Sequence, residues 1–571
     1  MTLTAPETAP STAKNLASQA PITMLNPDFP FPYDEYLAHP AGLGSIPEEL
    51  HGTEIAVVGA GMSGLVAAYE LMKLGLKPVV YESSRIGGRL RAGRPEGQEG
   101  PVADLGGMRF PRSGRSFFHY ADMLGIETQP FPNPLTAAAG STVIELGGQR
   151  HYAEKTQDLP EFFHRVSAAW DDCLQERACF AEMQEANRRR DLAEIKRIWN
   201  GLVPQFDDMS FSGYLATSKA FSALPFEYRE AFGQVGFGTG GWDTNFPDSF
   251  LEILRVVYVD ADADQHRIMG GAQLVPERLW NHSPATAVHW PAGTSLASLH
   301  GGNTRGAVKS INRQWNGDGA PGLIAVTDRW GRTNRYPAVI ATCQSWLLSA
   351  RIDVDESLFS HKLWTAIERS HYMQSSKTFV VVDRPFWKDR DPVTGQEIMS
   401  TTLTDRLTRG TYLLDNGADQ PALICLSYTW NDDALKWLPL DADERLRLML
   451  HSLGKIYPGV DIASHIVGDP ITVSWEDDPN FMGAFSDNLP GHYRYQERLY
   501  SHFMQEEHAP EHRGIFLAGD DVSWTGGWVD GAVTTGLNAV WGVMNQLGGT
   551  SHPDNPGPGD RYAELGPVRL P

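Results

Sequence analysis

The chain has 571 residues, of which 48 are basic and 70 acidic, giving a net charge of −22 at pH 7. This length predicts more than one domain core, and the negative charge excludes nucleic acid and anionic membrane surfaces as expected partners. The four cysteines form no C-x-x-C pair or metal-ligand pattern, and no apolar run reaches the roughly 18 residues of a membrane span. We therefore expect reduced thiols, no metal and a cytoplasmic protein.

Both ends of the chain have compositions typical of disorder. Residues 1–25 are rich in Ala, Thr, Ser and Pro, and they lack the basic start and apolar core of a signal peptide. Residues 551–571 contain the Pro- and Gly-rich run SHPDNPGPGD. Such segments bury too little apolar surface to fold, so we expect a disordered tail at each end.

The first structured unit follows the N-terminal segment. The apolar run Ile55–Val58 is typical of a strand, Leu65–Leu76 has helical periodicity, and Pro78–Tyr81 is typical of a second strand. The turn between the first strand and the helix has the pattern G-x-G-x-x-G, formed by Gly59, Gly61 and Gly64. These parts in this order predict a βαβ unit that binds a dinucleotide.

Each glycine of the pattern has a physical reason. Gly59 permits the tight turn, Gly61 lets backbone N–H groups approach a pyrophosphate at the helix N-terminus, and Gly64 lets helix and strand pack closely. Glu82 lies 18 residues beyond Gly64. A carboxylate at this distance accepts hydrogen bonds from a ribose diol.

The same βαβ unit serves nicotinamide and flavin cofactors, and two further features favour FAD. The run Arg85-Ile86-Gly87-Gly88-Arg89 resembles the second half of the fingerprint of glutathione-reductase-like flavoproteins, in which the arginine approaches the diphosphate. Far along the chain, an apolar strand runs into Gly519-Asp520, as in the part of these flavoproteins that contacts the ribityl-phosphate end of FAD.

The remaining elements follow from hydrophobic periodicity. Apolar residues at helical spacing, such as Phe162, Val166 and Trp170, predict helices across 115–235, and a Gly-rich segment at 236–242 precedes another helix. Apolar runs rich in β-branched residues predict strands at 308–311, 323–326, 338–342, 378–382, 422–428, 470–475 and 514–518. Helices are predicted at 442–456 and 532–547.

Several local motifs together resemble the flavin monoamine oxidase and L-amino-acid oxidase family. They are, in chain order, AGLGSIP, the dinucleotide-binding run, LGGMRFP, GFGTGGWD, QSSKTF, SWEDDP and AGDDVSWTGGWVDGAV. Within the family the likeness is greatest to bacterial L-arginine oxidases, L-lysine oxidase/monooxygenases and tryptophan 2-monooxygenases. The resemblance covers about residues 25–570 and implies FAD bound noncovalently and a homo-oligomer.

The fold implied is of the α/β and α+β classes, with three domains. A Rossmann-like (glutathione-reductase-like) FAD domain is expected to be discontinuous and built from residues 50–115, 290–345 and 505–550. A helical insertion domain is expected at 115–235. A substrate-binding domain with a mixed sheet is expected to take residues 236–290 and 346–504.

The resemblance also implies which residues hold the cofactor and the substrate. The expected cofactor residues are Gly59, Gly61, Met62, Ser63, Gly64, Glu82, Arg89, Met108, Arg109, Val308, Gly519, Asp520 and Val529. Arg109 matches the family's carboxylate-binding arginine, whose planar fork suits a bidentate grip. Lys377 matches the lysine that holds a water molecule beside flavin N5. The alternatives are a structural salt bridge for Arg109 and a solvated surface charge for Lys377.

An aromatic wall is expected beside these two cations. Trp528 matches an aromatic residue near the flavin, with the Gly527 carbonyl available to the substrate amine. Trp430 is expected to complete the wall and Tyr412 to make a second carboxylate contact. For Trp430, packing in the core is the open alternative, and Trp475 is expected to be structural.

The expected reaction is the oxidative deamination of an L-amino acid with O2 to a 2-oxo acid, ammonia and H2O2. The same scaffold supports a 2-monooxygenase, which gives an amide and CO2, and no motif separates the two. A monoamine or polyamine oxidase is disfavoured by Arg109, and a flavin-bearing interaction module is the non-enzymatic alternative. Asp260, Asp262 and Asp264 favour a basic substrate, arginine or lysine, over an aromatic one, unless this run is only a solvated loop.

Overall fold

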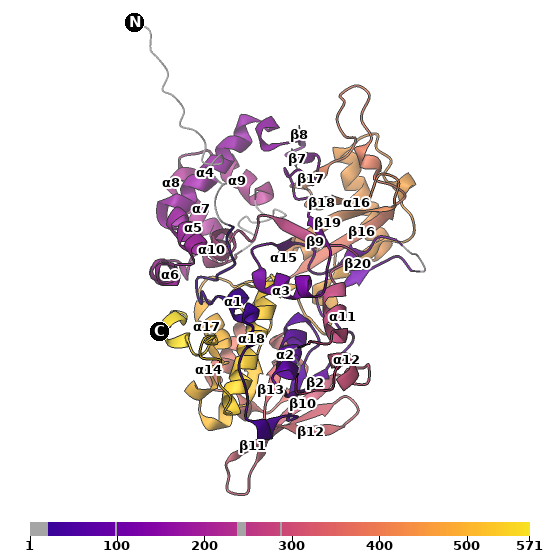
Figure 1. Ribbon diagram of the computed structural model, residues 1–571. Coiled ribbons are helices and arrows are strands. Elements are labelled where there is room, and N and C mark those ends of the chain that lie inside the picture. Colours follow the sequence, from indigo (N-terminus) through magenta and orange to yellow (C-terminus); the bar gives the residue numbers. More distant parts are fainter. Residues whose placement is uncertain (1–20, 97–99, 237–246, 286–287, 571) are drawn as a thin grey trace.

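A computed structural model describes residues 21–96, 100–236, 247–285 and 288–570. Three bodies of secondary structure make up the molecule (Figure 1): a parallel sheet with its helices in the lower half, a helical group at upper left, and a larger sheet at upper right. Within the described ranges, no helix combines the length and the apolar character needed to cross a bilayer.

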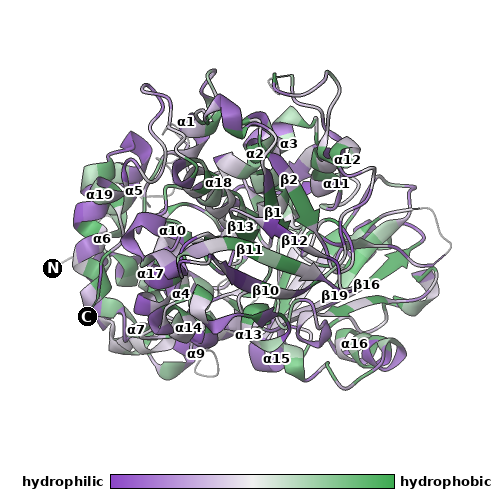
Figure 2. Ribbon diagram, turned by 90° about the horizontal axis from the view of Figure 1, so that it is seen from below, coloured by the Kyte–Doolittle hydropathy of each residue, from purple (hydrophilic) through white to green (hydrophobic). Residues whose placement is uncertain are grey.

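The lower body is built on a four-stranded parallel sheet with the order β2-β1-β13-β22. Its strands come from distant parts of the chain: β1 (Glu54–Val58), β2 (Lys77–Tyr81), β13 (Val339–Ala341) and β22 (Ile515–Leu517). Nearly every strand residue is buried, as a parallel sheet covered on both faces requires, and Figure 2 shows β1 and β2 as largely hydrophobic. The strands predicted in these four segments are confirmed.

Two long helices and a second sheet complete this body. Helices α2 (Met62–Lys73) and α18 (Val529–Gln546) are buried along almost their whole lengths. The second sheet has the order β12-β11-β10-β14. Its strands are β10 (Val308–Trp315), β11 (Pro321–Asp328), β12 (Thr333–Tyr336) and β14 (Asp353–Val354). The surrounding helices are α11 (Leu274–Asn281), α12 (Leu296–Leu299), α13 (Trp346–Ala350), α14 (His361–Arg369) and α17 (Tyr493–Ser501).

The larger sheet is mixed and has seven strands in the order β20-β16-β19-β18-β17-β7-β8. The strands are β7 (Thr142–Leu146), β8 (Gln149–Ala153), β16 (Ser375–Val382), β17 (Thr401–Thr404), β18 (Gly410–Leu414), β19 (Ala422–Trp430) and β20 (Ile471–Ser474). Helices α15 (Asn431–Leu435) and α16 (Ala442–Ile456) follow β19. The predicted strands and the predicted helix at 442–456 are confirmed.

The prediction of helices throughout 115–235 is wrong for its first third. After α3 (Arg115–Met123), the chain forms β6 (Thr128–Pro130) and then the hairpin of β7 and β8. The two hairpin residues, Gly147 and Gly148, have φ of 58° and 80°, the left-handed backbone that a tight hairpin turn needs. A Gly-Gly pair between two alternating runs was therefore the local signal for this hairpin.

The helical body begins at Glu161. Its helices are α4 (Glu161–Arg177), α5 (Phe180–Arg189), α6 (Leu192–Phe206), α7 (Phe211–Thr217), α8 (Lys219–Ser222), α9 (Phe226–Val235) and α10 (Phe250–Tyr258). Helix α6 shows why they form: the Asp191 side chain accepts from the Glu194 N–H at its start. Ile195, Trp199 and Leu202 then bury one face of the helix.

Short strands connect the bodies. The sheet β5-β9-β6 joins β5 (Phe110–Pro111) and β6 to β9 (Gln265–Ile268). Smaller pairs are β3 (Ala92–Gly93) with β4 (Ala103–Asp104), and β15 (Tyr372–Met373) with β21 (Phe485–Ser486).

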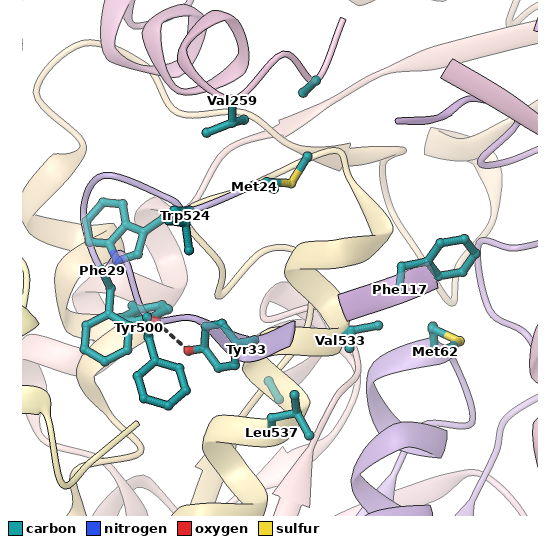
Figure 3. Close-up of a cluster of buried hydrophobic side chains, with 14 of the residues drawn as sticks. Met24, Phe29, Tyr33, Met62, Phe117, Val259, Tyr500, Trp524, Val533 and Leu537 are labelled. Carbon is teal, nitrogen blue, oxygen red and sulfur yellow. Dashed lines mark hydrogen bonds between the residues drawn. The ribbon is translucent and has the colours of Figure 1, made fainter. Parts of the chain in front are cut away.

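Both terminal segments pack where they are described, so the expectation of two disordered tails is wrong for residues 21–25 and 551–570. Residues 1–20 lie outside the described ranges. Ile22, Met24 and Leu25 are buried, and Met24 N–H donates to the Ser113 carbonyl at 2.8 Å. Figure 3 shows Met24 in the same hydrophobic cluster as Val533 of α18. This packing leads into α1 (Tyr33–Ala38).

The C-terminal segment is anchored by a few side chains. Helix α19 (Tyr562–Leu565) buries Tyr562 and Leu565, and Tyr562 lies 5.9 Å from Phe29 and 5.7 Å from Phe503 between ring centroids. The Asn555 side chain donates to the carbonyls of Tyr36 and Gly42, each at 3.0 Å. The average composition of the segment predicted disorder because it does not show that a few side chains are buried or hydrogen-bonded.

Candidate active site

A cavity of about 740 Å³ is lined by residues of all three bodies. The parallel-sheet body contributes Gly59 and Gly519, the larger sheet contributes Lys377 and Tyr428, and the helices contribute Phe232 and Ile253. All the expected cofactor residues except Gly64 line it: Gly59, Gly61, Met62, Ser63, Glu82, Arg89, Met108, Arg109, Val308, Gly519, Asp520 and Val529.

The turn into α2 has the geometry of a phosphate cradle. Gly59 has φ of 114°, and a Cβ there would lie 2.6 Å from Thr342 Oγ1. A Cβ on Gly64 would lie 2.1 Å from the Gly59 carbonyl oxygen, so this glycine serves helix–strand packing and has no place in the cavity wall. A Cβ on Gly61 would meet only Gly88, at 3.9 Å. No side chain caps the α2 N-terminus, which leaves its N–H groups for an anion.

Glu82 directly follows strand β2 and is fixed by backbone donors. One carboxylate oxygen accepts from Ala60 N–H at 2.8 Å, and the other accepts from Ser84 N–H at 2.9 Å. The side chain lines the cavity beside the glycine turn. This position suits the ribose contact expected from the spacing.

Arg89 and Asp520 connect the two distant motifs on which the FAD prediction rests. Their side chains form a salt bridge, and Arg89 also donates to the Ala484 carbonyl at 3.1 Å. Asp520 accepts from Ser486 N–H at 3.2 Å. Since both residues line the cavity, the N-terminal and C-terminal halves of the pattern meet at one site.

Lys377 is buried, so the alternative of a solvated surface charge is wrong. Its side chain is 2 % exposed, and its ammonium donates to the carbonyls of Asp104, at 3.3 Å, and Gly106. The ammonium lies 4.6 Å from the centre of the Tyr428 ring, which faces it across β16 and β19. Burial lowers the pKa of Lys377. Burial also raises the pKa of the neighbouring Asp104 carboxyl to about 7.

Arg109 lines the cavity without a carboxylate partner among the described residues. Its guanidinium carbon lies 5.9 Å from the Phe131 ring, 5.7 Å from the Tyr412 ring and 5.5 Å from the Tyr428 ring. The alternative of a structural salt bridge therefore has no partner in the described part of the chain. The Tyr412 and Tyr428 hydroxyls are within hydrogen-bonding reach of this guanidinium. Neutral hydroxyls do not balance its charge, so the planar donor group suits an incoming anion.

The two tyrosines beside Arg109 differ in their access to the cavity. Tyr412 is fully buried and does not line it, and its hydroxyl faces the Arg109 guanidinium. Tyr428 lines the cavity and was not singled out from the sequence. Only the register of β16 against β19, which pairs Lys377 with Tyr428, identifies it.

Aromatic side chains form another part of the wall. Trp430, Phe485 and Trp528 line the cavity, and the Trp430 and Phe485 ring centroids are 6.0 Å apart. Gly527 has φ of 80° and precedes Trp528, the N-cap residue of α18. Trp475, expected to be structural, also lines the cavity, and its indole N–H donates to the Leu105 carbonyl at 3.1 Å.

Of the acidic run, one side chain faces the cavity. Asp262 lines it and is solvent-exposed, and desolvation by the surrounding protein raises the pKa of this carboxyl to about 6. Asp260 accepts from the Gln184 side chain at 2.8 Å, and Asp264 is largely exposed, 3.4 Å from His266. The GFGTGGWD motif falls mostly on residues 237–246, outside the described ranges.

Comparisons with known proteins place the chain among flavoenzymes. The family model described as flavin containing amine oxidoreductase matches residues 62–544. A tryptophan 2-monooxygenase of Pseudomonas savastanoi is 32% identical over 90% of this chain and 93% of the relative. An L-amino-acid oxidase of Mus musculus is 27% identical over 87% of this chain and 71% of the relative.

Solved structures share the fold. A putrescine oxidase aligns with a TM-score of 0.63 and 20% identity, covering 87% of this chain and 100% of that structure. Cyclohexylamine oxidase from Brevibacterium oxydans aligns with a TM-score of 0.63 and 18% identity, with the same coverage. The predicted fold class is therefore confirmed, because the chain shares the fold of solved amine oxidases.

Proposed function

The chain belongs to the flavin containing amine oxidoreductase family, and from this we propose that it acts on an L-amino acid with O2 as a flavin-dependent 2-monooxygenase. In this reaction the amino acid becomes the amide with one carbon fewer, and CO2 is released. FAD is the cofactor that the glycine cradle, Glu82 and the Arg89–Asp520 pair fit.

The single observation that carries the proposal is Arg109. An amino acid differs from a simple amine by its carboxylate, and Arg109 offers a guanidinium with no carboxylate partner among the described residues. Charge-assisted bidentate contacts of this kind are strong and directional. A substrate without a carboxylate would leave this charge without a counterion in an aromatic wall, at a cost in free energy.

Lys377 has the contacts expected of a residue that orders water. An ammonium has three donors, and the carbonyls of Asp104 and Gly106 take two of them. We assign the third donor to a water molecule in the cavity, beside the flavin. The aromatic wall of Trp430 and Trp528 excludes other water and favours the uncharged amine.

When bound, FAD accepts the α-hydride and passes two electrons to O2. We expect it to be held noncovalently. Of the four cysteines, Cys343 lines the cavity. Burial raises the pKa of this thiol to about 12, which keeps it protonated and a poor nucleophile.

The choice of outcome rests on the named relatives. The relative of highest identity given above is called tryptophan 2-monooxygenase, and the match spans 90% of this chain. The second candidate is an L-amino-acid oxidase, supported by the mouse relative at 27% identity. Retention of the imino acid distinguishes the two outcomes. A retained imino acid is oxidised by the peroxide formed from O2, which gives the amide, CO2 and water, whereas a released one is hydrolysed to the 2-oxo acid and ammonia.

For the side chain of the substrate, Asp262 supports arginine or lysine. Its carboxylate on the cavity wall suits a distal cation, which needs a partner when it leaves water. An aromatic amino acid is the second choice, supported by Trp430 and Trp528 in the wall and by the relatives named for tryptophan.

The test is a panel of the L-amino acids with every product measured. A 2-monooxygenase forms one amide and one CO2 for each O2 consumed, with little H2O2. Stoichiometric H2O2, ammonia and 2-oxo acid would instead assign the oxidase. Turnover of amines alone would contradict both.

A further inference from the structure

Two carboxyl groups, Asp248 and Asp487, face each other at the border between the helical body and the cavity. Asp248 precedes α10, and Asp487 follows β21. The two segments run side by side, because Ser249 N–H donates to the Asn488 carbonyl at 2.9 Å. Asp248 is fully buried, and Asp487 is 6 % exposed and lines the cavity. Their side chains are within hydrogen-bonding reach of each other.

This pair has almost no other partners. Both carboxyl oxygens of Asp248 and one of Asp487 have no hydrogen-bond partner among the described residues, apart from the contact within the pair. Burial raises the pKa of both carboxyls, and the charge of Asp487 raises the pKa of Asp248 further. Two such groups in contact share a proton, since both cannot ionise at this distance.

The charged neighbours of the pair are already engaged. Glu252 on α10 accepts from Arg255 and from the Asn488 side chain, both at 2.7 Å, and Arg255 also binds Asp28. His371, beneath the loop, contacts the Asp487 carbonyl through Nδ1 at 2.7 Å, and burial lowers the pKa of this imidazole. Glu252 is thus paired with a cation, whereas Asp487 lines the cavity without an ion-pair partner among the described residues.

The loop that carries Asp487 also abuts the glycine turn before α18. A Cβ on Gly526 would lie 2.5 Å from the Ser486 carbonyl oxygen, and one on Gly527 would lie 3.1 Å from the Phe485 ring. The Gly527 carbonyl is where the substrate amine is expected. Asp487 directly follows the two residues that contact this turn, and it lines the same cavity as Gly527.

We propose that Asp487, with Asp248 behind it, accepts the proton that the α-ammonium group of the substrate must lose before oxidation. An N–H bond of the ammonium breaks, its electron pair stays on nitrogen, and an O–H bond forms on Asp487. The pair passes from one proton to two, and it returns the second proton to water in the cavity after turnover. Asp248 is a positioning residue, because it acts through Asp487. This inference rests on the proposed function.

The test is the rate of anaerobic flavin reduction as a function of pH, with the purified holoenzyme and a good L-amino-acid substrate. The wild-type rate should fall as pH drops through the pKa of Asp487, because the pair is then fully protonated. Asp487→Asn should lose this acidic limb and react about tenfold or more slowly at neutral pH, since general-base assistance is removed. Asp248→Asn should keep the fall in rate at low pH but move it to a different pH.

Asp207→Asn is the matched control. Asp207 is 6 % exposed, burial raises its pKa, and it does not line the cavity. It accepts from Tyr493 N–H, and its substitution should leave the pH profile unchanged. A second readout is independent of turnover: infrared titration of the wild type should show a protonated carboxyl band that is absent from Asp487→Asn and Asp248→Asn.

Two results would overturn the inference. One is a wild-type pH profile in Asp487→Asn, and the other is an effect confined to the KM of arginine and lysine, which would make the pair a side-chain subsite. Absence of the carboxyl band from the wild type would also refute the shared proton. Failure of every L-amino acid to reduce the wild-type flavin would refute the proposed function instead, so the two failures are distinguishable.

Discussion

Arg109 and Lys377, two cations of the cavity wall, are held in different ways. The Lys377 ammonium is fixed by two backbone carbonyls, whereas the Arg109 guanidinium is surrounded by aromatic rings and has no carboxylate partner in the described chain. Two of the three Lys377 donors are bound by the protein, which fixes the direction of the third. The charge of Arg109 is not balanced by a carboxylate, so it can bind an anion.

Replacing Arg109 by Met or Lys should therefore weaken substrate binding more than cofactor binding. The lost contact is worth on the order of 1.5–3 kcal/mol, so kcat/KM should fall roughly ten- to hundredfold or more, mainly through KM. Steady-state kinetics and the FAD content of the purified variant measure the two effects. Arg112→Met is the control, since Arg112 stacks on Phe118 and does not line the cavity. Unchanged kinetics in Arg109→Met would leave that arginine a purely structural role.

Lys377→Met should slow the reductive or the oxidative half-reaction by about tenfold or more, because it removes a preorganised cation and its water from the reacting centre. The fold should survive, since the Met side chain has a similar length and the site is apolar on the Phe379 side. Stopped-flow traces of each half-reaction provide the measurement. Wild-type rates in both would remove Lys377 from the site.

Asp262→Asn should raise the KM for arginine and lysine and leave aromatic amino acids nearly unaffected. Desolvation by the surrounding protein raises the pKa of Asp262 to about 6, so the wild-type preference for basic substrates should be full above this pH and decline below it. The ratio of kcat/KM for arginine to that for phenylalanine, measured on both sides of that pKa, tests both statements.

Asp260→Asn and Asp264→Asn are the matched controls for Asp262, because neither side chain lines the cavity. Both should keep the wild-type ratio. A wild-type preference for tryptophan or phenylalanine would defeat the assignment of a basic substrate.

At the scale of single elements, prediction succeeded where the pattern is local. The run Ile55–Val58, the glycines after it and the helix at 442–456 follow from period and turn chemistry within one segment, and the structure has them there. The hairpin of β7 and β8 was not predicted, because the helical spacing of apolar residues after it was extended to the whole segment. The Gly147-Gly148 pair, which forms its turn, is the local feature that indicates a hairpin.

The site was predicted to the extent that its residues lie beside glycine motifs. Gly59, Arg89, Arg109 and Asp520 could be named because their backbone contexts fix their places. Tyr428 depends on the register between two strands. The pair of Asp248 and Asp487 depends on how two loops far apart in sequence dock, which no local pattern encodes.

The C-terminal element provides a test of how the tails contribute to stability. Tyr562→Ala should lower the free energy of unfolding by roughly 3 kcal/mol, because it removes a buried ring packed against Phe29 and Phe503. Phe226→Ala is the control: that ring is 60 % exposed, and its loss should change stability by less than about 0.5 kcal/mol. Equal melting temperatures for the two variants would show that the packing of the C-terminal segment does not contribute to stability.

At the scale of the whole molecule, three bodies meet around one cavity, and each supplies a different part of the chemistry. The parallel-sheet body carries the cofactor cradle, the larger sheet carries Lys377 and the ring of Tyr428, and the helical body closes the remaining wall through Phe232 and Ile253. The central claim is that this cavity recognises the carboxylate of an L-amino acid.

The most direct measurement of this claim is anaerobic titration of the bound flavin with paired compounds that differ only in the carboxylate. The pairs are L-lysine with 1,5-diaminopentane and L-tryptophan with tryptamine. We predict that the preferred L-amino acid bleaches the flavin absorbance and that its decarboxylated partner does not at the same concentration, with the difference lost in Arg109→Met. Equal or faster bleaching by the amines in the wild type would contradict the account.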